Sequence, residues 1–490
     1  MRASTAFLVM LPMLLVTLLF VATQERRVGS AEPMRGGPYW DEATAAFVRQ
    51  RVARTYVDEL SPKEQADAFW RALDAYVRLD PYCDFIPPAE YRQWQESTAG
   101  RYGGLGIRID PEAEGLRILG ALPRGPAARA GLVPGDLIVS ADGRSLGGLD
   151  LKLDSAARLL KGPAGGAVKL LVRRAAGEGA APGTAPPPGT APAPSAPPLA
   201  PLREVVVVRE IVRPPGVFVR RVGPRQGVGV IRIAEFAETT PDEFDSALNG
   251  LLAQSLDGLV LDLRDNVGGV LTGAVHVVDR FLARGVVVRI EGRAPGTNRT
   301  YEAHPVATGP GADVSDTLPF VVLVNGHSAS ASEVVAGALQ DHRRALLVGE
   351  RTYGKFLVQQ IVEAPRGDCA VQLVTSRYYT PSGRSYQRRS TDGTFVSPLL
   401  KREDGVEPSA EPVAEAAGLL PDVMQTLSKD ERKRLRQLWD NEQDRSWGMQ
   451  ESTPDVPLSW VDPQLERALE VLEGALLMSK IRSTAPPRPR

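Results

Sequence analysis

A serine in a run of small residues, followed 25 positions later by a lysine, is the feature of this sequence best suited to catalysis. The apolar run from Phe320 to Val324 has the length and β-branched content of a buried strand, and Ser330 follows it, ahead of apolar residues at helical spacing. Backbone N–H groups and the positive end of the helix dipole are concentrated where a strand turns into a helix. Because a serine nucleophile and its oxyanion hole need that environment, Ser330 is a candidate nucleophile.

The hydroxyl group of this serine also needs a base, and two kinds of residue could supply one. Lys355 lies on a turn between two apolar segments, where burial would disfavour its charged form and free the lone pair. Gln359 could then hold the amine by a hydrogen bond without adding charge. His327 is only three residues from the serine, which leaves its imidazole little room to reach the hydroxyl group. A Ser-His-Asp hydrolase that uses His327 or His342 stays open as an alternative.

The residues around the serine and the lysine resemble those of the C-terminal processing peptidases, also called tail-specific proteases, which use a Ser–Lys dyad. The resemblance lies in the 25-residue spacing and in two runs, SASASE at 328–333 and GERTYGK at 349–355. It implies Ser330 as the nucleophile, Lys355 as the general base and Gln359 as the residue that orients the lysine. The family usually has a glycine after the lysine, whereas this chain has Phe356. This departure keeps a second alternative open, a catalytically inactive scaffold that only binds peptides.

An oxyanion hole is implied by the run DLRDNVGG at residues 262–269, which resembles the oxyanion segment of the same family. There the backbone N–H donors come from a glycine of the pair and from the residue after the nucleophile. In this chain those residues are Gly269 (or Gly268) and Ala331. Strands that alternate with helices around this run indicate a β/α core of crotonase-like layering.

An all-β stretch before this core has its motifs in a distinctive order, with GLGI at 104–107, AGLVPGD at 130–136 and DG at 142–143. This order resembles a PDZ domain of the protease-associated kind. The loop of Gly104, Leu105, Gly106 and Ile107 matches the place where such domains hold a chain terminus. Backbone N–H groups in such a turn capture a carboxylate, and an exposed strand edge pairs with the extended peptide.

The predicted fold class is an α/β multidomain protein, with a crotonase-like β/α serine-protease core, a PDZ domain that carries an inserted loop, and helical N- and C-terminal segments. The predicted organisation is a signal peptide or membrane anchor at 1–31, a helical region at 40–98, the PDZ domain at 99–213, the catalytic core at 214–426 and a helical tail at 427–490. The insertion at 175–202 is nearly all Ala, Pro and Gly, so it is expected to be a disordered hairpin loop of the PDZ domain.

The N-terminus has the layout of a secretory signal, with one arginine before an apolar run at 7–22 and small residues at 29–31. The alternative is an uncleaved anchor that tethers the protein through residues 7–22, although this run falls short of the ~20 residues that usually span a bilayer. Both interpretations predict an extracytoplasmic location.

Composition narrows the function classes. A formal net charge of −1 over 490 residues provides no global electrostatic basis for binding nucleic acid. The two cysteines form no CxxC motif and the four histidines are scattered, so neither a metal site nor a cofactor is expected.

The sequence therefore predicts an extracytoplasmic serine endopeptidase that acts through an acyl-enzyme. Its PDZ domain is expected to recognise protein or peptide substrates with apolar C-termini. The resemblance also implies a homodimer through the N- and C-terminal helices.

Overall fold

The computed structural model describes residues 50–51, 61–77, 82–147, 159–174, 201–223, 226–304, 314, 317–388, 417–446 and 460–484. The chain divides into two units, Met1–Ala75 and Tyr76–Arg490, and helix α3 (Pro62–Val77) contains the boundary. The predicted signal peptide or anchor, with its apolar run at 7–22, and nearly all of the predicted insertion lie outside the described residues. Within the described ranges, no helix combines the length and the apolar character that a membrane crossing requires.

A central sheet of the second unit is mainly parallel. Its strands, in spatial order, are β10 (Val217–Val222), β11 (Val228–Ile233), β12 (Gly258–Asp262), β15 (Phe320–Val324), β16 (Leu346–Gly349) and β19 (Val423–Met424). Only β10 runs antiparallel to its neighbour. Strands β12 and β15 are buried along their whole length and are apolar except for Asp262 at the end of β12, as expected of a parallel sheet that is covered on both faces.

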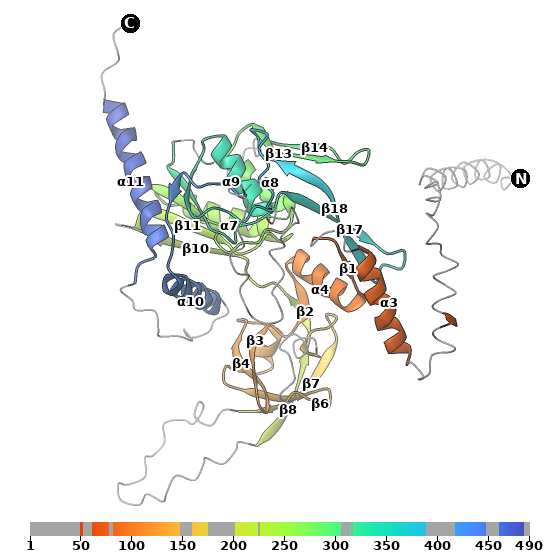
Figure 1. The fold of residues 1–490 in the computed structure, drawn as a ribbon. Coiled ribbons are helices and arrows are strands. Elements are labelled where there is room, and N and C mark those ends of the chain that lie inside the picture. Colours follow the sequence, from red (N-terminus) through yellow and green to blue (C-terminus); the bar gives the residue numbers. More distant parts are fainter. Residues whose placement is uncertain are drawn as a thin grey trace, which may run out of the picture. The chain divides into compact units, whose positions relative to one another are not determined.

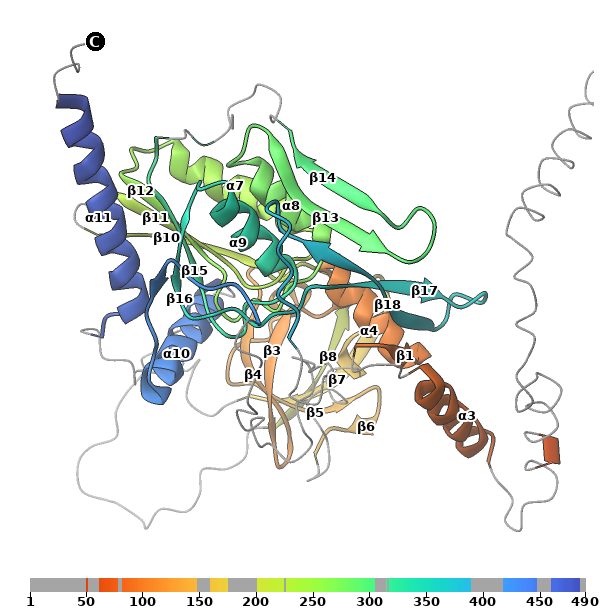
Figure 2. The same ribbon diagram turned by 45° about the horizontal axis from the view of Figure 1, so that its top comes forward.

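Helices cover the two faces of this sheet, and alternate residues of each strand face opposite sides (Figures 1 and 2). Leu259 and Leu261 of β12 pack with helices α7 (Thr240–Leu252), α8 (Leu271–Asp279) and α9 (Ala331–Asp341). Val260, between them, packs with α11 (Pro463–Thr484) on the other face. Helix α7 has a proline and two acidic residues in its first turn, where a missing N–H and negative charge are best tolerated.

A second sheet is organised around the long strand β18 (Ala370–Tyr379). Its other strands are β1 (Asp84–Ile86), β13 (Gly285–Gly292), β14 (Arg299–Ala303) and β17 (Leu357–Glu363). Strand β17 pairs with β18 from Leu357 to Glu363, whereas β1 and β13 pair with different parts of β18. Helix α4 (Pro88–Ala99) packs through Tyr91 against Ile86 and Ala370.

The predicted PDZ-like region contains a sheet with the order β3 (Ile107–Glu112), β4 (Gly115–Ala121), β5 (Leu137–Ala141), β7 (Ala167–Arg173) and β8 (Leu202–Val208). Short elements accompany it: β2 (Tyr102–Gly104), α5 (Pro126–Arg129), β6 (Arg144–Ser145) and β9 (Glu210–Val212). Arg173 at the end of β7 pairs with Leu202 at the start of β8. The insertion therefore joins neighbouring ends of an antiparallel pair, as the hairpin-loop interpretation predicts. Residues 153–160, whose amphipathic pattern predicts a short helix, lie mostly outside the described residues.

The sequence pattern predicts a helix from Leu271 to Leu282, and the helix in the structure is shorter. Helix α8 ends at Asp279, not at Leu282. The carbonyl oxygen of Val278 accepts from the N–H groups of both Phe281 and Leu282, so the last turn tightens and the α-helix ends there. Both side chains are still buried in the core, which is why the apolar pattern continues past the end of the helix.

Candidate active site

Three neighbouring strands of the central sheet carry the predicted parts of the site. Strands β12, β15 and β16 are parallel, so their carboxyl ends lie at one edge of the sheet. The loop after β12 contains Gly268 and Gly269, the loop after β15 leads to Ser330, and the chain after β16 reaches Lys355. This edge is where open α/β sheets place their ligands. The topology thus brings together residues that are up to 87 positions apart in the chain (355 minus 268).

Ser330 occupies the N-cap of helix α9 with a φ of +56° and a ψ of −116°. A positive φ is unfavourable for a residue with a Cβ and is found where surrounding contacts hold it in place. The neighbouring serines do not share this position. Ser328 and Ser332 are buried, and their hydroxyl groups donate to the carbonyl oxygens of Leu263 (2.8 Å) and Asn266 (2.9 Å). Ser330 is the partly exposed member of the three, which fits the choice of the middle serine.

The glycine pair lies against the serine turn. A methyl group added to Gly268 would lie 2.7 Å from Cβ of Ser330 and 3.0 Å from the amide nitrogen of Ala331, so only glycine fits there. The N–H of Gly268 is already used, since it donates to Oδ1 of Asn266 (2.9 Å). Two backbone hydrogen bonds form a β-bridge between this loop and Phe236: the N–H of Phe236 donates to the carbonyl oxygen of Gly268, and the N–H of Val270 donates to the carbonyl oxygen of Phe236. Neither bond uses the N–H of Gly269.

Ala331 is the first residue of α9, a position whose N–H has no acceptor within the helix. Of the three predicted oxyanion residues, Gly269 and Ala331 therefore have N–H groups that could bind an oxyanion. Gly268 contributes by having no side chain, which lets the loop pack closely against Ser330.

Lys355 is buried, with 7% of its surface exposed. Its Nζ donates a hydrogen bond to Oε1 of Gln359 and lies 5.4 Å from the centre of the Tyr82 ring. Burial lowers the pKa of Lys355 to about 8, although the nearby carboxylate of Glu333 acts to raise it. In the described part of the chain, no hydrogen bond joins Nζ of Lys355 to Oγ of Ser330. The structure thus brings the lysine to Gln359 as predicted and leaves the serine–lysine hydrogen bond unmade.

Glu333 links Ser330 to Lys355, a contact that the sequence reasoning missed. Its buried carboxylate accepts hydrogen bonds from the N–H groups of Ser330 (2.9 Å), Gly354 (2.7 Å) and Lys355 (2.8 Å), and from the hydroxyl group of Thr352 (2.6 Å). Burial raises the pKa of Glu333 to about 7, against the effect of these four donors. The spacing of Ser330 and Glu333 is that of a capping box, the signal that could have revealed this contact.

Phe356 is accommodated without strain in the position where the family usually has glycine. It is fully buried and stacks on Tyr378 with ring centres 4.7 Å apart, while Tyr386 meets it edge-on at 5.9 Å. The residue of this turn that has a positive φ (+93°) is Gly354, so Phe356 is not required to adopt one. The hydroxyl group of Tyr378 also lies 3.0 Å from the carbonyl oxygen of Ser330.

The histidine alternative receives no support from the geometry. His342 follows the last turn of α9, at the opposite end of the helix from Ser330, and its Nε2 lies 2.8 Å from the carbonyl oxygen of Val286. His327 is exposed on the approach to the serine turn, where its N–H donates to Oδ1 of Asn325.

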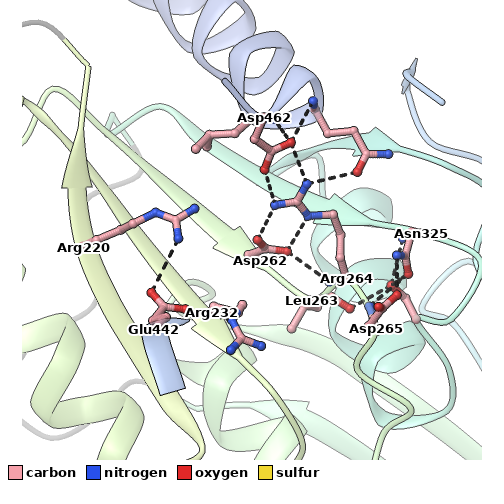
Figure 3. Close-up of polar contacts among 12 residues, drawn as sticks. Arg220, Arg232, Asp262, Leu263, Arg264, Asp265, Asn325, Glu442 and Asp462 are labelled. Carbon is pink, nitrogen blue, oxygen red and sulfur yellow. Dashed lines mark hydrogen bonds and ion pairs between the residues drawn. The ribbon is translucent and has the colours of Figure 1, made fainter. Parts of the chain in front are cut away.

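A buried ionic network lies at the end of β12, the strand that leads into the glycine loop (Figure 3). Arg264 lies between the carboxylates of Asp262 and Asp462, and all four residues of the network, including Gln464, are buried. The guanidinium donates to Asp262 (2.8 and 2.6 Å), to Asp462 (3.0 and 2.8 Å) and to Gln464 (3.1 Å), which uses all five of its N–H groups. Asp462 immediately precedes α11 and Gln464 lies in its first turn, so the network ties this C-terminal helix to the strand that leads into the glycine loop.

Asp462→Ala is expected to lower the free energy of unfolding by about 3 kcal/mol, because it leaves buried N–H groups of Arg264 without an acceptor. The measurement is the urea midpoint at pH 7. Glu470→Ala removes an exposed acidic residue from the same helix and is expected to change the free energy by no more than about 0.5 kcal/mol. Equal effects of the two substitutions would contradict a supporting role for the network.

The PDZ-like region presents the predicted loop at the end of a free strand edge. Leu105 is buried, and its carbonyl oxygen accepts from the N–H of Ala127 (3.0 Å), while Gly106 has a φ of +68°. Strand β3, which follows the loop, is the terminal strand of its sheet and pairs only with β4 among the described residues. The geometry therefore leaves the outer edge of β3 able to pair with an extended peptide.

Comparison with known proteins identifies two matching regions. Residues 227–396 match the model of peptidase family S41, and residues 117–174 match that of the PDZ domain. A carboxy-terminal-processing protease of Bartonella bacilliformis is 35% identical over 316 residues, covering 64% of this chain and 65% of the relative. A carboxyl-terminal-processing protease of Synechocystis sp. is 31% identical over 336 residues, covering 67% and 71%.

Among solved structures, a photosystem II D1 C-terminal processing protease is 28% identical, with a TM-score of 0.38. The match covers 78% of this chain and 86% of the chain of that protease. The matches thus span 65% and 71% of the lengths of the two curated relatives named above.

Proposed function

This chain belongs to peptidase family S41, with the carboxyl-terminal-processing proteases, and we propose that it is an extracytoplasmic serine endopeptidase with a Ser330–Lys355 dyad. The observation that carries the dyad is the environment of Lys355, a buried amine held by a neutral amide beside the serine turn. An amine whose pKa lies at about 8 is partly neutral at physiological pH and able to accept a proton.

In the proposed mechanism, Nζ of Lys355 turns from Gln359 to the hydroxyl group of Ser330 when substrate binds. It takes the hydroxyl proton while Oγ attacks the scissile carbonyl carbon. The negative charge on the carbonyl oxygen is stabilised by the N–H groups of Gly269 and Ala331. The protonated lysine then gives its proton to the leaving amine. A water molecule, activated by the same lysine, hydrolyses the acyl-enzyme and releases the serine.

The PDZ domain supplies the proposed recognition of the substrate. Its loop from Gly104 to Ile107 would hold the terminal carboxylate through backbone N–H groups, and the free edge of β3 would pair with the residues before it. Binding of this kind requires the substrate to have an extended, unstructured C-terminus. The extracytoplasmic location rests on the apolar run at 7–22.

The proposal is tested by incubating the full chain with an unfolded protein that ends in apolar residues, and with the same protein bearing a C-terminal amide. We expect cleavage of the first and at least ~10-fold slower cleavage of the second, since the amide removes the charge that the loop recognises. Tight binding of the first protein without any cleavage would instead favour the inactive scaffold. Equal cleavage of both proteins would contradict recognition of the chain terminus.

A further inference from the structure

Tyr82 comes from a distant part of the chain and lies at the catalytic lysine. It precedes strand β1, which pairs with β18 from Asp84 to Ile86, and β18 in turn pairs with β17, the strand that carries Gln359. The N–H of Val374 in β18 also donates to Sγ of Cys83 (3.4 Å). These contacts fix Tyr82 in place, with only 3% of its surface exposed.

Two contacts connect Tyr82 to the base. Nε2 of Gln359 donates to the carbonyl oxygen of Tyr82 (2.7 Å), and Oε1 of the same amide accepts from Nζ of Lys355. Because the NH₂ group of Gln359 is spent on a carbonyl oxygen, its own oxygen must face the lysine. The second contact is the Tyr82 ring, whose centre lies 5.4 Å from Nζ.

We propose that Tyr82 is a positioning residue for the general base: its ring shields Lys355 from water, and its carbonyl oxygen orients Gln359 toward the amine. This inference rests on the proposed function, because it takes Lys355 as the base. Tyr82 itself lies before both of the regions that the family models match, whereas Lys355 and Gln359 lie within the S41 region.

The charges around the lysine make this shielding necessary. Glu333 acts to raise the pKa of Lys355, so burial must outweigh it to keep the amine partly neutral. The other titratable groups nearby are the hydroxyls of Tyr82, Tyr353 and Tyr378, and Arg388, whose guanidinium lies 4.9 Å from the Tyr353 ring. Burial raises the pKa of each of the three tyrosines, so all remain neutral and none offsets the charge of Glu333.

The ring could also attract the charged amine through its π face, which would favour the protonated form. Shielding and attraction have opposite effects on the ionisation of the lysine, so substitutions that separate them decide between the two. Tyr82→Phe removes only the hydroxyl group. Tyr82→Leu removes the π face and keeps an apolar cover, whereas Tyr82→Ala removes both.

The experiment measures kcat/KM from pH 6 to 10 for the wild-type protein and these three variants. For Tyr82→Ala we expect the midpoint of the rise to move up by about one pH unit, so that activity at pH 7 falls roughly tenfold and recovers toward the wild-type value near pH 10. Tyr82→Phe and Tyr82→Leu should keep the midpoint within ~0.3 units of the wild type. Should Tyr82→Ala fail to fold, Tyr82→Val takes its place, with a smaller upward shift.

Phe85→Ala is the matched control, because it removes a buried aromatic side chain from the same segment, at the β1–β18 pair. It is expected to lower stability without moving the midpoint. A Tyr82→Ala profile that is reduced equally at every pH, or a midpoint that moves downward, would overturn the proposal. Failure of the proposed function looks different: the wild-type profile would then lack an ionisation that depends on Lys355.

Discussion

Ser330→Ala is expected to lower kcat/KM by at least ~10⁴-fold, because removal of the nucleophile leaves only the residual effect of binding and of the oxyanion donors. The assay follows cleavage of an unfolded protein substrate at pH 8 to 9. Ser330 is the residue of its run that combines partial exposure with the N-cap of α9, next to Gly268 and the N–H of Ala331.

Ser328→Ala and Ser332→Ala are the matched controls for this prediction. Their hydroxyl groups donate to carbonyl oxygens of the loop after β12, so their loss should lower stability by about 1 kcal/mol each and leave measurable activity. An inactive Ser328→Ala protein that retains its fold, together with an active Ser330→Ala protein, would mean that the nucleophile is wrongly assigned.

The second large effect concerns the base and its pH dependence. If neutral Lys355 takes the serine proton, kcat/KM should rise with pH along one ionisation and level off above it. Because burial lowers the pKa of Lys355 to about 8, the midpoint should lie near pH 8. At pH 7 roughly one tenth of the lysine is then neutral. Each further unit of acidity should lower the rate by at least about tenfold, because Glu333 also takes up a proton at about pH 7.

Lys355→Arg and Lys355→Ala are both expected to be inactive at every pH that the protein tolerates. The arginine keeps the positive charge but stays protonated, so it cannot accept the serine proton. His327→Ala is the control and should keep the wild-type pH profile, since this histidine is exposed and its backbone, not its ring, makes the contact to Asn325. An active arginine variant would refute the role of the lysine.

The parts of the fold that the sequence predicted well are those with strong local patterns. The strand at 320–324 has the predicted bounds because a β-branched apolar run of that length has few alternatives to a buried strand. The hairpin position of the insertion followed from composition, since a stretch of Ala, Pro and Gly between two apolar runs has no core of its own. The crotonase-like layering of the core stays a prediction.

The contacts that the sequence did not reveal depend on long-range packing. Glu333 is close to Ser330 in sequence and accepts a hydrogen bond from its N–H group. The N–H groups of Gly354 and Lys355 also donate to Glu333, and these two residues come near it only in the folded chain. Tyr82 lies 273 positions before Lys355 (355 minus 82) and reaches it only because β1 pairs with β18. No periodicity or spacing can indicate such a neighbour, whereas it follows at once from the order of strands in the sheet.

Phe356 is a residue whose role the sequence alone could not indicate. As a departure from the family pattern it kept open the alternative of an inactive scaffold that only binds peptides. In the fold its ring fills a space between Tyr378 and Tyr386, while the preceding Gly354 carries the positive φ. A residue next to the proposed base can therefore belong to the core packing, and only the side chains around it in the fold show this.

The central claim, a serine activated by a buried lysine, is tested most directly by labelling the protein with a fluorophosphonate and locating the adduct by mass spectrometry across a range of pH. The account predicts one adduct, on Ser330, with a labelling rate that rises with pH to a midpoint near 8 and falls by at least ~10³-fold in Lys355→Ala. An adduct on another serine, or a labelling rate that is unchanged in Lys355→Ala, would contradict it.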